Sequence, residues 1–248
     1  MVAVHMPIRT TRDRWFFSGM ALIAALTVFG GFAPTYYLKG LYGTPTLSTV
    51  RHLHGITFTL WMVLFLVQTA LIAARRTAWH RRLGIAGTVL AGGMLVIGTA
   101  VAISAARHPP APGVAPGLPP PLVFLLIPLS DLAAFAMLAG SGVYYRRKPD
   151  IHKRLMLLAT IAILPAALGR MVFPGGLLDF LGLPVGPLTL TGLTALFVGA
   201  CLLYDRLAQG RVHAATLWGG SFLLGAQVLR LFVAGTATWL TVARWLTS

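Results

Sequence analysis

Apolar stretches of roughly 18 residues or more recur along the whole chain, and this feature limits the fold more than any other. The mean hydropathy is +0.80, and only 10% of the residues are charged. Such stretches are typical of helices that cross a membrane. They are too long and too continuous for the strands of a membrane barrel, the other structure that satisfies the backbone in lipid. The sequence therefore predicts an all-α integral membrane protein.

Seven spans can be placed, each close to the ~20 residues that cross about 30 Å of hydrocarbon. They cover residues 15–34, 52–74, 81–105, 121–145, 152–173, 187–205 and 213–235. We expect a single membrane domain over residues 1–248, folded as a bundle of seven transmembrane helices.

The distribution of basic residues predicts the orientation, because Lys and Arg gather in cytoplasmic loops. A cytoplasmic N-terminus and an outer C-terminus place 14 of the 20 Lys and Arg residues inside, namely Arg9, Arg12, Arg14, Arg75, Arg76, Arg81, Arg82, Arg146, Arg147, Lys148, Lys153, Arg154, Arg206 and Arg211. This bias accounts for the net charge of +15. No basic stretch carries interleaved aromatic residues, so nucleic acid is not an expected partner.

Two segments outside the spans have a distinct composition. Residues 107–121, RHPPAPGVAPGLPPP, hold seven of the sixteen prolines and predict a stiff, polyproline-type outer loop. The last stretch, ATWLTVARWL, either extends the seventh helix or lies along the membrane interface, where Trp239 and Trp245 would suit it.

A histidine stands at the cytoplasmic entrance of the third, fifth and seventh spans. These residues are His80, His152 and His213, in ARRTAWHRRLG, YRRKPDIHKRLM and YDRLAQGRVHAAT. In one interpretation the Arg and Lys residues snorkel to headgroups while each histidine anchors or caps a helix end. In another, the three imidazoles converge on a metal or haem iron, with Asp205 as a fourth ligand. Proton or lipid-headgroup chemistry is a third interpretation.

A second polar set is predicted in the outer half of the membrane. It consists of His52, His54, Gln68, Asp131, Arg170, Gln227 and Arg230. A carboxylate near mid-membrane costs about 2.5–3.5 kcal/mol or more, so Asp131 needs a partner, a proton or a water-filled pocket. Arg170 and Arg230 are the candidate partners. The set is either a buried ion pair that joins helices, or an outward pocket that binds a cofactor such as haem or a quinone.

The motifs HRRLG (80–84) and HKRLM (152–156) resemble a family of bacterial polytopic membrane proteins of unknown function. Its signature is an HR-x-x-G box followed two spans later by an HR-x-x-M box that leads to an arginine, matched here by Arg170. Gln68 and Arg75 match a preceding Q…R element, so the resemblance covers about residues 51–173. The histidines are also weakly similar to those of b561-type haem cytochromes, which place paired histidines inside two helices rather than at helix ends.

Three functions follow as expectations. The first is a membrane-embedded redox protein that binds haem b or a transition metal and exchanges electrons, with quinone as a partner. The second is a non-catalytic accessory or assembly subunit of a respiratory or photosynthetic membrane complex, without a cofactor, since no complete catalytic motif is present. The third is a proton-coupled carrier that uses Asp131 and the histidines as a relay. Whether the protein is an enzyme stays open, and the expected location is the bacterial inner membrane.

Overall fold

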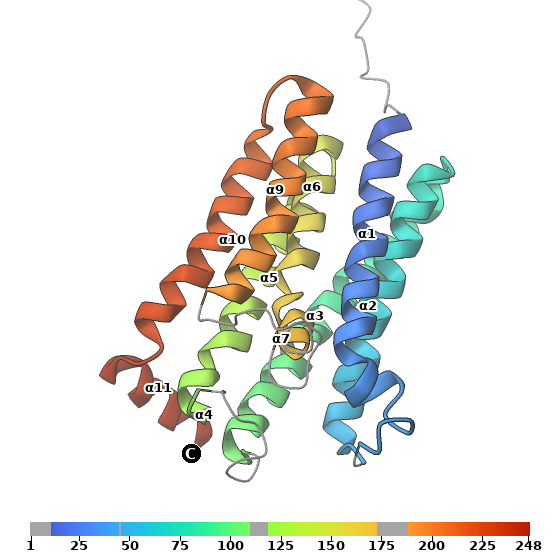
Figure 1. The fold of residues 1–248 in the computed structure, drawn as a ribbon. Coiled ribbons are helices and arrows are strands. Elements are labelled where there is room, and N and C mark those ends of the chain that lie inside the picture. The colour runs from blue at the N-terminus through green and yellow to red at the C-terminus, as the bar shows by residue number, and fades with distance from the viewer. Residues whose placement is uncertain (1–10, 45, 110–118, 173–187) are drawn as a thin grey trace, which may run out of the picture.

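The computed structural model describes residues 11–44, 46–109, 119–172 and 188–248, and these form a bundle of helices (Figure 1). No strand occurs among the described residues. The elements are α1 (Thr11–Phe32), the π-helical turn η1 (Ala33–Tyr37), α2 (Thr49–Ala73), α3 (Thr77–Arg107), α4 (Pro121–Phe124), α5 (Leu126–Tyr144), α6 (Pro149–Ala162), α7 (Pro165–Val172), α9 (Thr189–Gln209), α10 (Ala214–Val233) and α11 (Ala237–Thr247).

Seven helical segments of the described chain are long and apolar enough to cross a membrane. They are Thr11–Tyr37, Thr49–Ala73, Thr77–Arg107, Pro121–Tyr144, Pro149–Val172, Thr189–Gln209 and Ala214–Val233. The predicted all-α, seven-helix fold is confirmed, and each predicted span overlaps one of these segments. By length and composition, this is the architecture of a multi-pass membrane protein.

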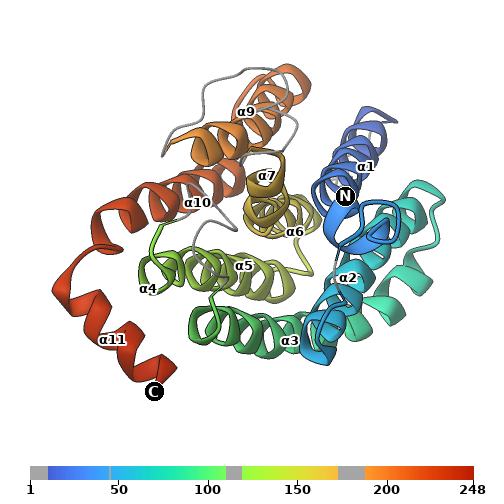
Figure 2. The same ribbon diagram turned by 60° about the horizontal axis from the view of Figure 1, so that its bottom comes forward.

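The segment made of α6 and α7 lies at the centre of the bundle. Its most apolar window is 72% buried, against 17% to 39% for the other six segments. Figure 2 shows α1, α2, α5, α9 and α10 arranged around it. The helix is interrupted between Ala162 and Pro165, because proline has no backbone N–H to continue the hydrogen-bond ladder. Because α6 lies at the centre of the bundle, its side chains can reach neighbouring helices on several sides.

The bundle has a basic end, defined as the end where α1, α3, α6 and α10 begin and where α2, α5 and α9 finish (top of Figure 1). We expect this end to face the cytoplasm, because it carries most of the Lys and Arg residues. The other end is called the opposite end below.

The C-terminal stretch forms a separate helix at the opposite end. The seventh span finishes at Val233, and α11 packs against α3 and α4. Trp239 Nε1 donates a hydrogen bond to the Leu122 carbonyl at 2.8 Å, and Arg107 donates to the carbonyls of Thr247 and Ser248. Of the two predicted alternatives, extension of the seventh helix is therefore wrong. Most of the proline-rich loop, residues 110–118, lies outside the described residues.

Helix α1 approaches the central segment closely at one glycine. A Cβ atom added at Gly31 would lie 2.8 Å from the Cα of Ala167 in α7. Carbon atoms at that distance overlap, and the backbone of α7 cannot move away as a flexible side chain could. Small residues permit this kind of close helix packing in membranes.

We predict that Gly31→Ala destabilises the protein by about 1–3 kcal/mol, since overpacking forces the two helices apart. Thermal unfolding of the detergent-solubilised protein measures the change. Gly19→Ala is the matched control in the same helix, because nothing lies within 4 Å of its added Cβ. That variant should be neutral or slightly more stable. Equal melting temperatures for the two variants would contradict the proposed contact.

Candidate functional site at the basic end

Three consecutive residues at the start of the central helix contact three different neighbours. His152, Lys153 and Arg154 lie in the first two turns of α6. Successive residues of an α-helix are rotated by about 100°, because a turn contains 3.6 residues. The three side chains therefore point in three directions, and each one finds a partner on another helix.

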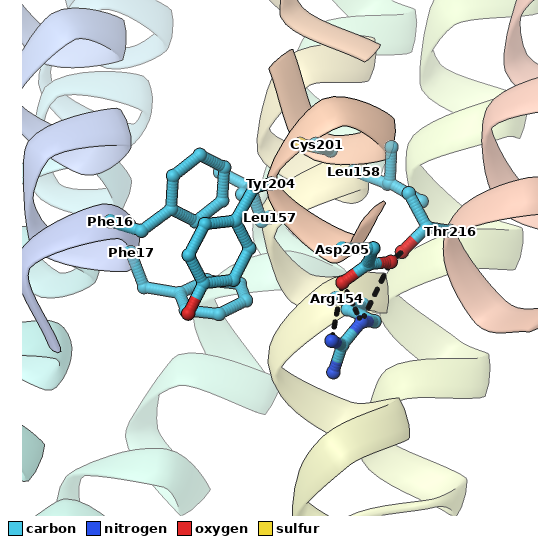
Figure 3. A pocket seen from close by; sticks show the side chains of 9 residues that line it. All are labelled: Phe16, Phe17, Arg154, Leu157, Leu158, Cys201, Tyr204, Asp205 and Thr216. Atoms are coloured by element: carbon cyan, nitrogen blue, oxygen red, sulfur yellow. Dashed lines mark hydrogen bonds and ion pairs between the residues drawn. The ribbon is translucent and has the colours of Figure 1, made fainter. Parts of the chain in front are cut away.

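Arg154 points toward α9 and α10 and forms a buried ion pair with Asp205 (Figure 3). Its Nη2 lies 2.5 Å from Asp205 Oδ1, and its Nε donates to the same carboxylate at 3.0 Å. Arg154 is 3% exposed and Asp205 is 1% exposed. The second carboxylate oxygen accepts from the Thr216 hydroxyl at 2.5 Å and from the His213 backbone N–H at 3.2 Å. The ion pair thus joins α6, α9 and α10.

This geometry corrects one detail of each of two interpretations. In the first, Arg154 would snorkel to lipid headgroups at the water boundary, but it is buried and paired. In the second, Asp205 would be a fourth metal ligand, but both of its oxygens accept hydrogen bonds from protein donors. A carboxylate and a guanidinium form strong, bidentate hydrogen bonds, which explains why Asp205 pairs with Arg154.

Lys153 points the other way and binds α1. Its Nζ lies 2.8 Å from Asp13 Oδ2 and 2.6 Å from Asp150 Oδ1. The hydroxyl of Tyr204 in α9 donates to the other Asp13 oxygen, and the Tyr204 ring stacks on Phe16 with centroids 3.8 Å apart (Figure 3). The basic-end network is defined here as Asp13, Asp150, Lys153, Arg154, Tyr204, Asp205 and Thr216. It connects four helices through three of the five aspartates.

His152 points toward α5 and α3. Its Nδ1 lies 2.8 Å from the Gly142 carbonyl oxygen. A carbonyl can only accept a hydrogen bond, so Nδ1 carries a proton and is the donor. The ring centroid of His152 is 6.1 Å from that of His80, with the two planes at 82°. Two of the three histidines predicted to converge are therefore neighbours.

Gln68 lies beside this histidine pair rather than in the outer half of the membrane. Its Nε2 is 3.8 Å from the place of an added Cβ on Gly84, which is one helical turn after His80 on the same face of α3. The side-chain oxygen of Gln68 is buried and has no hydrogen-bond partner. The prediction that grouped Gln68 with His54 is wrong, because 14 residues of helix separate them by about 21 Å. A buried acceptor without a donor indicates a place for a further polar group.

His213 has a structural role at the start of α10. Its Nδ1 accepts a hydrogen bond from the Ala215 N–H at 3.1 Å, which caps the helix. The predicted metal site of His80, His152, His213 and Asp205 is not assembled. Among the described residues, no group of three or more His, Cys, Asp or Glu side chains could hold a metal ion.

A small cavity adjoins the ion pair of Arg154 and Asp205. Its walls are lined by Phe16, Phe17, Arg154, Leu157, Leu158, Cys201, Tyr204, Asp205 and Thr216 (Figure 3). Its volume of about 10 Å³ is at the lower limit for a single water molecule. The cavity is therefore too small for haem or a quinone.

In the opposite half of the bundle, Asp131 of α5 forms an ion pair with Arg230 of α10. Arg230 Nη1 lies 2.6 Å from Asp131 Oδ1, and the two residues are 5% and 7% exposed. Of the three predicted alternatives for Asp131, a partner, a proton or a water-filled pocket, the structure shows a partner, and it is Arg230 rather than Arg170. Gln227, one turn before Arg230, donates to the Thr194 hydroxyl at 3.4 Å. These contacts join α5, α9 and α10.

The remaining residues of the predicted outer set lie around the opposite end of α1. The Arg170 guanidinium lies over the Phe32 ring at 4.1 Å and donates to the Ala166 carbonyl of its own helix. The His54 ring lies against that of Phe58, with centroids 4.2 Å apart and planes tilted by 34°. Its Nδ1 is buried without a hydrogen-bond partner. The His52 ring lies 6.0 Å from that of Tyr36. The predicted outer set, Gln68 included, is thus divided among three places, and the alternative of a buried ion pair that joins helices is met by Asp131 and Arg230.

Lys153, Asp13, Tyr204 and Thr216 belong to the basic-end network but were not predicted as site residues. A signal for Asp13 was present. The chain has five acidic residues against 20 basic ones, so an aspartate beside an apolar span is expected to pair with one of the many cations, because an unpaired carboxylate there is costly. Tyr204 and Thr216 carried no signal, because their hydroxyls became important only through the fold.

No family model, curated protein or solved structure matches the chain. The resemblance to the family with HR-x-x-G and HR-x-x-M boxes therefore stays a prediction.

We predict that Asp205→Asn destabilises the protein by about 3–5 kcal/mol, because it leaves the buried Arg154 charge without a counter-charge. The matched control is Asp150→Asn, which removes a carboxylate whose side chain is 50% exposed. That change should cost about 1 kcal/mol or less. Thermal unfolding in detergent compares the two. Equal losses would mean that the Arg154–Asp205 pair contributes no more than a surface pair.

We predict that His213 makes the protein less stable as the pH falls. Burial, and next the Arg154 guanidinium, lower the pKa of His213 below its ordinary value of 6.5. The folded state therefore binds a proton less readily than the unfolded state, so stability is complete above about pH 6.5 and decreases below it. Protonation of Nδ1 also removes the cap. His213→Asn keeps a capping side chain without the titration, so its melting temperature should fall less between pH 7.5 and pH 5.5. Parallel curves for the two proteins would refute this role.

Proposed function

We propose that the protein is a membrane-embedded electron-transfer protein whose His80 and His152 hold one haem b iron at the basic end. The observation that carries the proposal is the separation of the two rings. Two imidazoles that held one metal ion between them, at metal–nitrogen distances of about 2 Å each, would have ring centroids on the order of 6 Å apart. The centroids of His80 and His152 are 6.1 Å apart.

The hydrogen bond of His152 supports the same assignment. A histidine that binds a metal usually donates its other ring N–H to a carbonyl or carboxylate, which fixes the tautomer and the ring orientation. The Gly142 carbonyl accepts such a hydrogen bond from Nδ1. Gly142 lies in α5 and His152 in α6, so the short connection between the two helices orients the ring.

The charge around the histidines favours an anionic cofactor over a bare divalent cation. Arg81 and Arg82 follow His80 directly, and none of the ion pairs formed among the described residues involves them. A divalent cation would be repelled by these guanidinium groups. Haem carries two propionates, which guanidinium groups bind through paired hydrogen bonds. Bound haem would supply one-electron redox chemistry, while His80 and His152 set its orientation and the arginines its charge environment.

The other expected functions have less support. A relay through Asp131 would require an exchangeable proton, and this carboxylate already accepts from Arg230. The quinone partner and the location in a bacterial inner membrane stay predictions. So does the alternative of an accessory subunit of a membrane complex, which the test below separates from the present proposal.

We predict an absorption band of bound haem when the protein is expressed with a haem supply and purified in detergent. His80→Ala and His152→Ala should each lower the haem-to-protein ratio roughly tenfold or more, since each removes an iron ligand. His52→Ala, at the opposite end, is the control and should keep the wild-type ratio. A wild-type protein that stays folded without haem would refute the proposal, and a stoichiometric metal without the haem spectrum would replace haem by a metal ion.

A further inference from the structure

A groove runs along the surface between α1 and α9 at the basic end. Its volume is about 350 Å³, and its walls are formed by Thr11, Arg12, Trp15, Tyr204, Leu207 and Ala208. Phe16, which follows Trp15 in α1, stacks on Tyr204. Trp15 and Leu207 in the walls of the groove are exposed, so the groove lies on the outer surface of the bundle.

The position of the groove along the helices corresponds to the membrane interface. Thr11 is the first residue of the first membrane-crossing segment, and Leu207 and Ala208 lie in the last turn of the sixth. The Trp15 side chain is 76% exposed and that of Leu207 is 72% exposed. Tryptophan is enriched at the level of lipid headgroups, where one side of the ring is apolar and the other wet. The walls of the groove thus suit a molecule with a polar head and an apolar tail.

The positive charge of Arg12 in the groove favours a molecule with an anionic head group. Arg12 is exposed, and none of the ion pairs among the described residues includes it. The neighbouring carboxylate, Asp13, is already engaged by Lys153 and Tyr204. None of the described residues that line the groove carries a carboxylate. A guanidinium group in this setting binds a phosphate through paired hydrogen bonds, and the Thr11 hydroxyl can donate a further one.

We propose that this groove is a specific binding site for one anionic phospholipid. The phosphodiester lies against Arg12 and Thr11, and an acyl chain lies along Trp15 and Leu207. The lipid contacts the ring of Tyr204, whose hydroxyl holds Asp13, and Asp13 in turn holds Lys153 of the central helix. Occupancy of the groove therefore stabilises the contact between α1 and α9 in the basic-end network. This site is independent of the proposed haem.

The test is native mass spectrometry of the purified full-length protein in detergent, titrated with phosphatidylglycerol or phosphatidylcholine. The wild type should bind a first phosphatidylglycerol more tightly than a first phosphatidylcholine. Arg12→Ala should weaken the first phosphatidylglycerol about fivefold, as expected for one basic residue near an anionic lipid. Arg12→Lys should weaken it less than Arg12→Ala does, because the positive charge stays while the paired hydrogen bonds are lost. Arg51→Ala, an exposed arginine at the opposite end, is the matched control and should bind as the wild type does.

A second variant tests the groove rather than the charge. Ala208→Trp fills the space and leaves Arg12 in place, so it should also weaken the first phosphatidylglycerol. Phosphatidylglycerol should raise the melting temperature of the wild type more than that of Arg12→Ala. In phosphatidylcholine the two proteins should have the same melting temperature. Equal affinity for the two lipids, or wild-type binding by either Arg12→Ala or Ala208→Trp, would overturn the proposal.

Discussion

The buried ion pair between Arg154 and Asp205 is the interaction on which the arrangement of the basic end depends. It fixes the central helix against α9 and α10, and the next residue back, Lys153, fixes the same helix against α1. With both cations engaged, His152 has a defined direction toward α5 and α3. One tripeptide therefore contacts five neighbouring helices, α1, α3, α5, α9 and α10, and sets the orientation of the candidate iron ligand. A helix in lipid gains little from hydrophobic contact with another helix, so such polar contacts carry much of the specificity.

The seven helices, and the need of Asp131 for compensation in the membrane, could be predicted because both follow from properties of the local sequence. The length of each apolar run determines whether it can cross a membrane, and the cost of an unpaired carboxylate predicts that Asp131 finds a cation. The choice between Arg170 and Arg230 could not be predicted. Both arginines lie toward the same ends of their helices, and only the packing of α10 against α5 brings Arg230 to Asp131.

The contacts of the three histidines and of Arg154 at the basic end could not be predicted for a related reason. His80, His152 and His213 occupy equivalent positions at three helix starts, which predicted three equivalent ligands. Equivalence along the sequence does not give equivalence in the bundle, because α6 is central whereas α10 is peripheral. His213 therefore caps its own helix, while His152 faces His80. Arg154 was interpreted as a surface residue because basic neighbours flank it, yet its partner Asp205 lies 51 residues away.

The distribution of acidic residues explains why the basic end would attract anions from outside the protein. Asp13, Asp150 and Asp205 are the described carboxylates at that end, and all three bind Lys153 or Arg154. The other cations of that end, including Arg12, Arg81 and Arg82, are left without an internal counter-charge among the described residues. Packing further aspartates into the bundle would cost desolvation energy, whereas anionic groups at the interface keep part of their hydration. The same excess of positive charge therefore supports both the haem propionates proposed beside His80 and the phospholipid proposed beside Arg12.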